Sequence, residues 1–194
     1  MVINHRIIIY VCIFSSLLII LVSNPANIQG IFHSESSEEF KTYENPLYGI
    51  NIKYPTDWRY YEKNGPETFS PDRIFQVSFL SPSNKVLSDM VFVWFNIEKI
   101  KDSVSLDDRK NILLKNLNNS SIDVKVQSTK LSGIDAFMID YTNKVIELQR
   151  NIGIEAIRDG LLYSLDFTAR PDTFEKNLDS IETMIKSMNI SSIA

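Results

Sequence analysis

Hydrophobic and polar positions divide the chain into three parts. The first contains a run of sixteen uncharged, mostly apolar residues, Ile7 to Val22, and ends near Gly30. A polar stretch follows, and from Phe40 onward short runs alternate between apolar and polar positions. This pattern predicts a signal peptide or membrane anchor at residues 1–30, a polar linker at 31–39 and one folded domain at 40–191.

The N-terminal run has a length between those of two known kinds of segment. As a helix it would be about 24 Å long, whereas a bilayer span needs about twenty residues and a signal-peptide core about 7–15. Cleavage after Ala26 or Gly30 would place Asn24 or Ile28 at the −3 position, which is unfavourable, so an uncleaved anchor is preferred to a removed signal. Because Arg6 precedes the run, both alternatives place the domain outside the cell membrane.

Strands are predicted wherever apolar residues recur with a period of two. The run Met90 to Phe95 is apolar at every position, which is typical of a central strand covered on both faces. Asp159-Gly160 lies between two long alternating runs and predicts a β-hairpin. The other predicted strands are 50–54, 75–79, 122–126, 134–141, 146–157 and 161–168.

Two helices are predicted. One follows Ser105, which with Asp108 forms a capping box before an apolar face that ends at Leu117. The other follows Pro171, with Asp172 and Glu175 as a second capping box, and its apolar stripe comprises Phe174, Leu178, Ile181, Ile185 and Met188. Hairpin-linked strands with two helices predict an α+β fold with a mainly antiparallel sheet and helices on both faces, preceded by an N-terminal hydrophobic helix.

Residues Tyr43 to Trp58, YENPLYGINIKYPTDW, carry a family resemblance. This segment resembles the opening of PsbP-like domains, the family of the extrinsic photosystem II subunit, and of its archaeal single-domain extracytoplasmic relatives. The hairpin through Gly160 and a final helix ending in Met188-Asn189-Ile190 agree with it. The resemblance implies an α/β/α sandwich and an accessory role of docking on larger assemblies. It implies no site residues here, because the domain lacks the histidines of metal-binding relatives.

Composition excludes several classes of chemistry. After Gly30 the chain has 19 basic and 24 acidic residues, a net charge of −5, which argues against a nucleic-acid binder. Cys12 and His33 are the last residues of their types, so the domain has no thiol nucleophile, no histidine base and no zinc ligands. The sequence therefore predicts no enzyme activity, no cofactor and no metal site.

Acidic residues in one loop-rich stretch are the remaining metal candidates. A calcium site needs carboxylate and carbonyl oxygens, but a solvated acidic loop is the preferred interpretation of these residues, which are Asp57, Glu62, Glu67 and Asp72.

Two kinds of surface feature are also predicted. Asn118, Asn119 and Asn189 begin N-x-Ser sequons and are candidate glycan acceptors. Tyr60-Tyr61 and Phe69 form either an exposed aromatic patch for a partner or, as preferred, part of a core or edge strand.

The sequence thus favours an extracytoplasmic, membrane-tethered or secreted accessory module without catalytic activity. Its expected partners are the membrane, through the N-terminal segment, and a protein at the membrane surface. One alternative is a binding protein for a small apolar ligand, with a pocket lined by Phe92, Trp94 and Phe137. The other is a hydrolase that uses carboxylates alone, in a cleft where two facing acids have raised pKa values.

Overall fold

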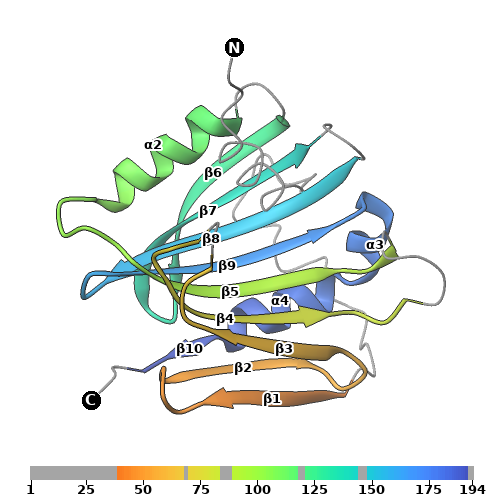
Figure 1. Cartoon of the computed structure of the whole chain (residues 1–194). Coiled ribbons are helices and arrows are strands. Elements are labelled where there is room, and N and C mark those ends of the chain that lie inside the picture. The colour runs from red at the N-terminus through yellow and green to blue at the C-terminus, as the bar shows by residue number, and fades with distance from the viewer. Residues whose placement is uncertain (1–38, 68–69, 84–88, 118–120, 144–147, 192–194) are drawn as a thin grey trace.

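The computed structural model describes residues 39–67, 70–83, 89–117, 121–143 and 148–191, which form two antiparallel sheets and three helices (Figure 1). The predicted N-terminal hydrophobic helix and most of the linker lie outside these ranges. Within the described part of the chain, no helix is long and apolar enough to cross a membrane.

The larger sheet has seven strands in the order β3-β4-β5-β9-β8-β7-β6, and every neighbouring pair is antiparallel. Its strands are β3 (Arg59–Asn64), β4 (Arg73–Leu80), β5 (Phe92–Lys99), β6 (Ser121–Leu131), β7 (Ile134–Asn143), β8 (Gln149–Arg158) and β9 (Leu161–Ala169). The smaller sheet has the order β1-β2-β10, with β1 (Phe40–Asn45), β2 (Ile50–Pro55) and β10 (Asn189–Ile190). The prediction of a mainly antiparallel sheet is confirmed.

The main core lies on one face of the larger sheet. Alternate residues of its central strands point to this face, as the period of two requires. They pack with the small sheet and with α4 (Leu178–Ser187), whose Ile181 and Met184 are completely buried. The strand residues at its centre are Phe75, Val77, Phe79, Val93, Phe95, Ile97, Leu165 and Phe167.

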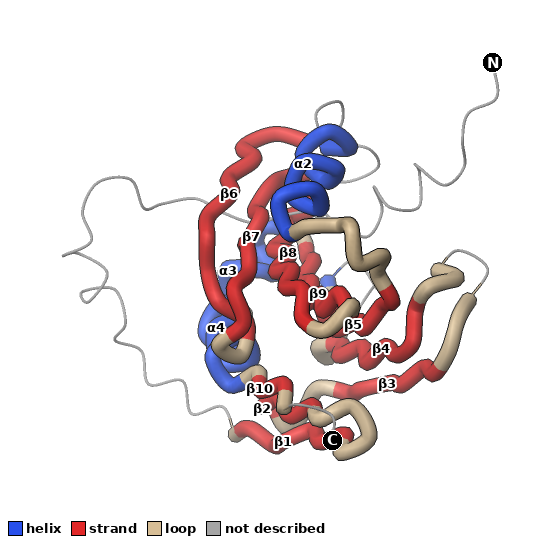
Figure 2. The backbone as a smooth tube through the Cα atoms, turned by 90° about the vertical axis from the view of Figure 1, so that its left-hand side faces the viewer, coloured by secondary structure: helices blue, strands red, loops and turns tan. Residues whose placement is uncertain are grey.

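A second, smaller core forms where α2 (Leu106–Leu117) contacts β7 and β8. Leu113 and Leu117 of the helix pack on Phe137, Ile139 and Tyr141, the set of β7 side chains that points away from the main core. Figure 2 shows α2 on one side of β7 and β8, with α3 (Pro171–Lys176) and α4 on the other. Helical cover is partial, however, because α2 covers only one end of its face and α4 packs mainly on β2.

The run Met90 to Phe95 does contribute to an interior strand, but the expectation that both faces of that strand are covered is wrong. The strand begins at Phe92, continues to Lys99, and is completely buried only at alternate positions, since Phe92 and Trp94 remain partly exposed. The described strands that are buried on both faces are β8, β9 and the second half of β7. The reason is the position of α2, which contacts β8 and leaves the corresponding face of β5 open.

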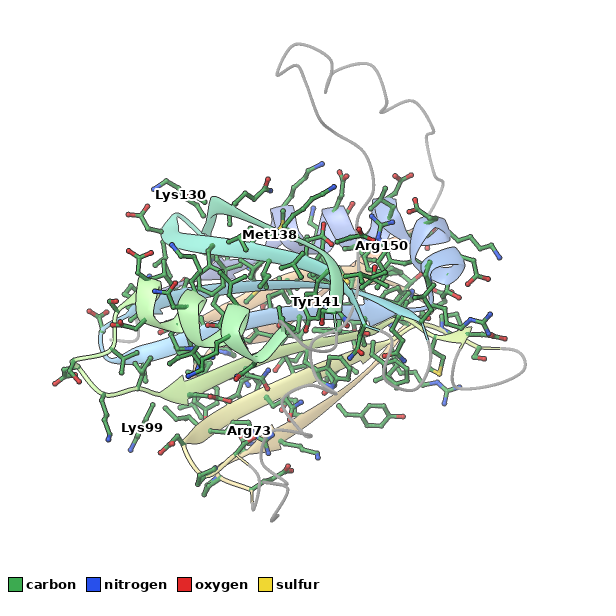
Figure 3. The ribbon with its side chains drawn as sticks, turned by 90° about the horizontal axis from the view of Figure 1, so that it is seen from above. Arg73, Lys99, Lys130, Met138, Tyr141 and Arg150 are labelled. Carbon is green, nitrogen blue, oxygen red and sulfur yellow. The ribbon has the colours of Figure 1, made fainter. Side chains whose placement is uncertain are left out.

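The predicted C-terminal helix is two helices separated at Asn177, whose φ and ψ of −111° and 14° are not helical. The predicted capping box is also wrong, because Arg170 occupies the N-cap position and makes no side-chain cap hydrogen bond. Glu175 instead forms an ion pair with Arg150, which lies over the Phe174 ring at 5.6 Å. Figure 3 shows Arg150 beside the C-terminal helices. Burial lowers the pKa of the Arg150 guanidinium, and Glu175 opposes this effect. This contact fixes α3 against the end of β8.

Strands β1, β3 and β10 were not predicted. All six residues of β3 are exposed, so its sequence shows no alternation of buried apolar and exposed polar positions. Strand β10 has only two residues, which is too short to show a pattern. The Ser105–Asp108 capping box is confirmed by mutual hydrogen bonds. The Asp159-Gly160 hairpin is confirmed as well, with positive φ values of 54° and 71° at its two turn residues.

Gly49 closes the turn between β1 and β2 and lies against the end of β10. Its φ is 63°, its carbonyl accepts a 2.8 Å hydrogen bond from the Ser191 amide, and a Cβ there would lie 2.8 Å from the Ser191 carbonyl oxygen. The residue must therefore be glycine for both backbone conformation and space.

We expect Gly49→Ala to lower the free energy of unfolding by at least about 2 kcal/mol, measured by urea titration. Gly133→Ala is the matched control, because Gly133 has a φ of 79° but no heavy atom within 4 Å of its added Cβ. The control should lose only about 1 kcal/mol, from backbone strain. Equal losses in the two variants would contradict a close contact at Gly49.

Candidate functional site

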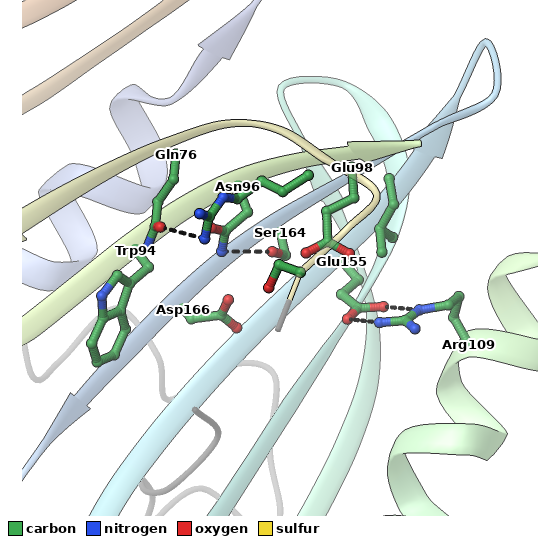
Figure 4. A pocket seen from close by; sticks show the side chains of 11 residues that line it. Gln76, Trp94, Asn96, Glu98, Arg109, Glu155, Ser164 and Asp166 are labelled. Atoms are coloured by element: carbon green, nitrogen blue, oxygen red, sulfur yellow. Dashed lines mark hydrogen bonds and ion pairs between the residues drawn. The ribbon is translucent and has the colours of Figure 1, made fainter. Parts of the chain in front are cut away.

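A polar pocket of about 160 Å³ lies on the face of the larger sheet that α2 leaves open (Figure 4). Strands β4, β5, β8 and β9 contribute its floor, and α2 contributes one wall through Arg109. Its lining residues are Ser70, Arg73, Gln76, Trp94, Asn96, Glu98, Arg109, Glu155, Leu162, Ser164 and Asp166.

The antiparallel register brings the floor residues together. Trp94 of β5 is opposite Asp166 of β9, and Asn96 is opposite Ser164. Ser164 is in turn opposite Glu155 of β8. Since side chains alternate across a sheet, the same strands present apolar residues to the main core and polar residues to the pocket.

Glu155 and Arg109 form the strongest ion pair of the pocket. The Arg109 Nε and Nη2 atoms donate to the two carboxylate oxygens at 3.0 and 2.7 Å, which is a bidentate arrangement. The Glu155 side chain is only 1% exposed, and that of Arg109 is 19% exposed. The pair attaches α2 to the sheet at the pocket rim, and it leaves neither group available as a strong charge for a ligand.

Two further acids lie in the pocket without an ion pair among the described residues. Burial raises the pKa of Asp166 well above its ordinary value, and nearby Glu155 raises it further, whereas a hydrogen bond from Ser164 opposes both. Burial also raises the pKa of Glu98, and Arg109 opposes that effect. The Asp166 side chain is 2% exposed, and its Oδ1 atom has no hydrogen-bond partner.

Arg73 limits the pocket at the other end. Its guanidinium forms a 2.8 Å ion pair with Glu67 and donates a 2.8 Å hydrogen bond to the Gln76 Oε1 atom. Asn96 donates at 3.3 Å to the Ser164 hydroxyl, so amide and hydroxyl groups line the space between the two arginines.

Polar groups continue behind the pocket, under strands β7 and β8. Tyr141 and Asn151 are cross-strand neighbours and almost completely buried, and their side-chain polar atoms have no hydrogen-bond partner among the described residues. Burial raises the pKa of the Tyr141 phenol, and the charge of Asp166 adds to this effect. Unpartnered buried polar groups are costly, so this concentration of them marks the region as one that selection for stability alone does not explain.

The sequence analysis did not identify this site. The signal was available in the polar residues at alternate positions of two otherwise apolar strands, among them Ser164 and Asp166 of β9. Glu155 lies in a similarly apolar run. What periodicity could not reveal is that α2 and the neighbouring strands bury these positions.

Two of the four acids considered as calcium ligands, Glu62 and Glu67, make contacts with other side chains. Glu67 pairs with Arg73 and with Lys63 at 2.9 Å, and Arg73 lowers its pKa. Glu62 accepts a 2.5 Å hydrogen bond from the Tyr43 hydroxyl. The described residues contain no cluster of three or more histidines, cysteines or acids arranged for a metal ion.

The apolar pocket considered from the sequence does not form among the described residues. Phe92 and Trp94 stack with ring centroids 5.7 Å apart, but Trp94 lines the polar pocket. Phe137 instead lines a separate, more open groove beside α2, together with Leu106, Leu114 and Val126. The three aromatic residues therefore do not share one cavity.

Tyr60 and Tyr61 lie on the edge strand β3 and are 47% and 55% exposed. Tyr60 still contacts the rings of Tyr43 and Phe79, so the preferred edge-strand interpretation describes both residues. Phe69 lies outside the described residues.

One of the three sequon asparagines lies in the described part of the chain. Asn118 and Asn119 fall outside the described ranges. Asn189 is exposed on β10, and its amide donates to the Ser191 hydroxyl of the same sequon at 3.3 Å. Its use as a glycan acceptor remains a prediction.

Comparison with family models gives a match to the description "PsbP-like protein" over residues 1–190. The chain belongs to the PsbP-like family. The resemblance inferred from the segment between Tyr43 and Trp58 is thus confirmed at the level of the family.

Solved structures with the PsbP-like fold agree. The chain is similar to cyanobacterial PsbP of Synechocystis, with a TM-score of 0.57, 13% identity and coverage of 78% of this chain and 92% of that one. It is also similar to LpqN of Mycobacterium tuberculosis, described as involved in cell envelope biogenesis, with a TM-score of 0.54, 14% identity and coverage of 80% and 92%. Curated proteins give no match. At these identities the structural likenesses show the fold alone.

We expect Arg109→Met to lower the free energy of unfolding by about 3 kcal/mol or more, because it leaves the Glu155 carboxylate buried without its partner. The double variant Arg109→Met/Glu155→Met should recover most of that loss. Lys110→Met is the control, since the exposed Lys110–Asp107 pair contributes less than about 1 kcal/mol. Urea titration of the variants gives the values, and additive losses in the double variant would contradict the coupling.

The raised pKa of Asp166 predicts a pH dependence of stability. The folded state holds the proton of Asp166 more tightly than the unfolded state, so this residue favours folding below its unfolded pKa of about 3.9. That contribution is lost as the pH rises through the folded-state pKa. Asp166→Asn, which mimics the neutral carboxyl, should therefore raise the melting temperature at pH 7 and change it little at pH 3.5. A variant less stable than the parent at pH 7 would contradict a buried, destabilising carboxylate.

Proposed function

We propose that this PsbP-like protein is an extracytoplasmic accessory module, and that it binds its partner or ligand through the polar pocket on the open face of the sheet. Its N-terminal hydrophobic segment would act as an anchor or signal, with the linker at residues 31–39 as a tether. The two sheet faces have different roles in this proposal. The apolar face builds the core, and the polar face is available for recognition.

The proposal rests on one observation, which is that the polar groups of the pocket lower the stability of the folded state. Asp166 is buried and Glu98 is partly buried, neither forms an ion pair with another described residue, and the bidentate Arg109–Glu155 pair fixes the rim beside them. Such groups do not improve stability, because a buried polar atom without a partner loses its hydration without compensation. Binding of a complementary group would provide that compensation.

The family and the fold are consistent with this role but do not specify a partner. Proteins with this fold include an extrinsic photosystem II homologue from a cyanobacterium and a mycobacterial protein involved in cell envelope biogenesis. We propose a similar kind of role here, at a membrane surface and without catalysis. The sandwich arrangement expected of the family would leave the pocket facing away from the small sheet.

A hydrolase that uses carboxylates alone is a second candidate. Glu98 and Asp166 line one pocket and both have raised pKa values, which is the property that acid–base catalysis requires. The register, however, places them four positions apart along neighbouring strands, because Asp166 is opposite Trp94 and Glu98 is opposite Leu162. They therefore do not project from facing positions, and the binding function is preferred.

Affinity purification of the tagged full-length protein from its native membrane, followed by mass spectrometry, tests the binding function. We expect a stoichiometric protein partner with the parent chain and its loss with Trp94→Ser, which alters the pocket wall. Leu47→Ser is the matched control, because Leu47 is 70% exposed at the turn of the small sheet, and it should retain the partner.

Three outcomes would change the conclusion. A partner retained by both variants would contradict binding at the pocket. A co-purifying small molecule without a protein partner would replace protein docking by ligand binding. Turnover of ester or glycoside substrates that is lost in both Asp166→Asn and Glu98→Gln would favour the hydrolase. The intact mass of the purified chain shows in the same experiment whether residues 1–30 are retained.

A further inference from the structure

The carboxyl groups that line the pocket, those of Glu98, Glu155 and Asp166, outnumber its two arginines. Of its two cationic residues, Arg109 is paired with Glu155, and Arg73 is paired with Glu67. Glu98 and Asp166 have no ion pair in the described part of the chain, and Asp166 has a buried carboxylate oxygen that accepts no hydrogen bond. The group that is missing from this arrangement is therefore a cation with hydrogen-bond donors.

The other lining residues restrict the kind of cation. Trp94 lies opposite Asp166 in the register, so its ring stands beside the unpartnered carboxylate (Figure 4). An indole face attracts an organic cation by its quadrupole. The Ser164 hydroxyl and the amide groups of Asn96 and Gln76 add short-range polar contacts, and about 160 Å³ admits only a compact group.

A metal ion fits these residues less well than an organic cation. The described residues present no cluster of three or more acids, histidines or cysteines for a metal, although three acids line the pocket. Arg109 already donates hydrogen bonds to both oxygens of the Glu155 carboxylate, and a metal ion would have to displace it.

We propose that the pocket binds a compact primary alkylammonium group, with the Asp166 carboxylate as its anionic contact, the Trp94 ring as one wall and Glu98 as a more distant negative charge. The proposal rests on the binding function above and names the chemistry that is bound. The group could belong to a free amine or to a lysine side chain of a docked protein, since both present the same –CH₂–NH₃⁺ end.

Binding of this group should be linked to proton release. Asp166 is faced by Glu155 of β8, Glu98 of β5, Tyr141 of β7 and Arg109 of α2, and the two acids together with burial favour its protonated form in the empty pocket. An ammonium ion favours the ionised form. The affinity should therefore decrease as the pH is lowered through the range in which Asp166 takes up its proton.

The two tryptophans of the chain provide a direct test. In full-length protein labelled with ¹⁵N at the indoles, Trp94 reports on the pocket, and Trp58, which is 3% exposed in the main core, serves as an internal control. We expect n-butylamine to shift the Trp94 indole resonance in a saturable way and to leave that of Trp58 unchanged. The pH-matched neutral and anionic analogues n-butanol and n-butyrate should shift neither resonance.

Variants identify the contacts. Asp166→Asn should weaken n-butylamine binding at least about tenfold, and Glu98→Gln should weaken it to a smaller extent. Asp135→Asn is the matched control, since Asp135 is an exposed acid that pairs with Lys130 on the β6–β7 hairpin, and its affinity should equal that of the parent. An unchanged Trp58 resonance shows in each case that the core is intact.

Several results would overturn the proposal. These are equal shifts with n-butanol, undiminished binding by Asp166→Asn, or an Asp166-dependent response to calcium chloride without one to n-butylamine. Loss of amine binding while a Trp94-dependent partner is still recovered from membranes would leave the binding function standing and remove only the ammonium chemistry. Binding of Nα-acetyl-lysine amide as well as n-butylamine would identify the lysine of a partner as a source, and binding of n-butylamine alone a free amine.

Discussion

The structure depends on the two-residue period of the β8–β9 hairpin. One set of its side chains, including Ile154 and Leu165, builds the main core, and the other set, including Glu155 and Asp166, forms the floor of the pocket. A shift of one residue in the register of this hairpin would exchange the two sets. The two-residue turn at Asp159-Gly160 sets that register, and the buried contacts on both faces maintain it.

Buried charge on the second face is tolerated because the stabilisation comes from elsewhere. The main core is large and contains many completely buried aromatic and branched residues, among them Phe75, Phe95 and Phe167. That contribution offsets the desolvation of Asp166, and the bidentate contact with Arg109 reduces the free-energy cost of burying the Glu155 carboxylate. The protein therefore separates the face that determines its stability from the polar face to which we assign recognition.

Periodicity predicted the strands that have one apolar face, such as β2 and β4, and the α2 helix with its Ser105 cap. It did not predict β3, which has no buried residue, because pairing with β4 and not side-chain burial holds that strand in place. The pocket was missed for a related reason. The polar character of Asp166 is visible in the sequence, but its burial depends on contacts with residues distant in sequence, which local patterns do not encode.

Both outer strands of the larger sheet carry charged and polar side chains, and this feature affects how copies of the domain would pack beside one another. Lys63 lies on β3 and Lys125 and Lys130 on β6, where the backbone is not paired on its outer side. At Asp123 the register of β6 also shifts, with a φ of 56°. Charged side chains and such irregularities oppose pairing between the edges of neighbouring sheets. Domains crowded by attachment to one surface would therefore remain separate molecules, each with its pocket free, instead of joining into continuous sheets.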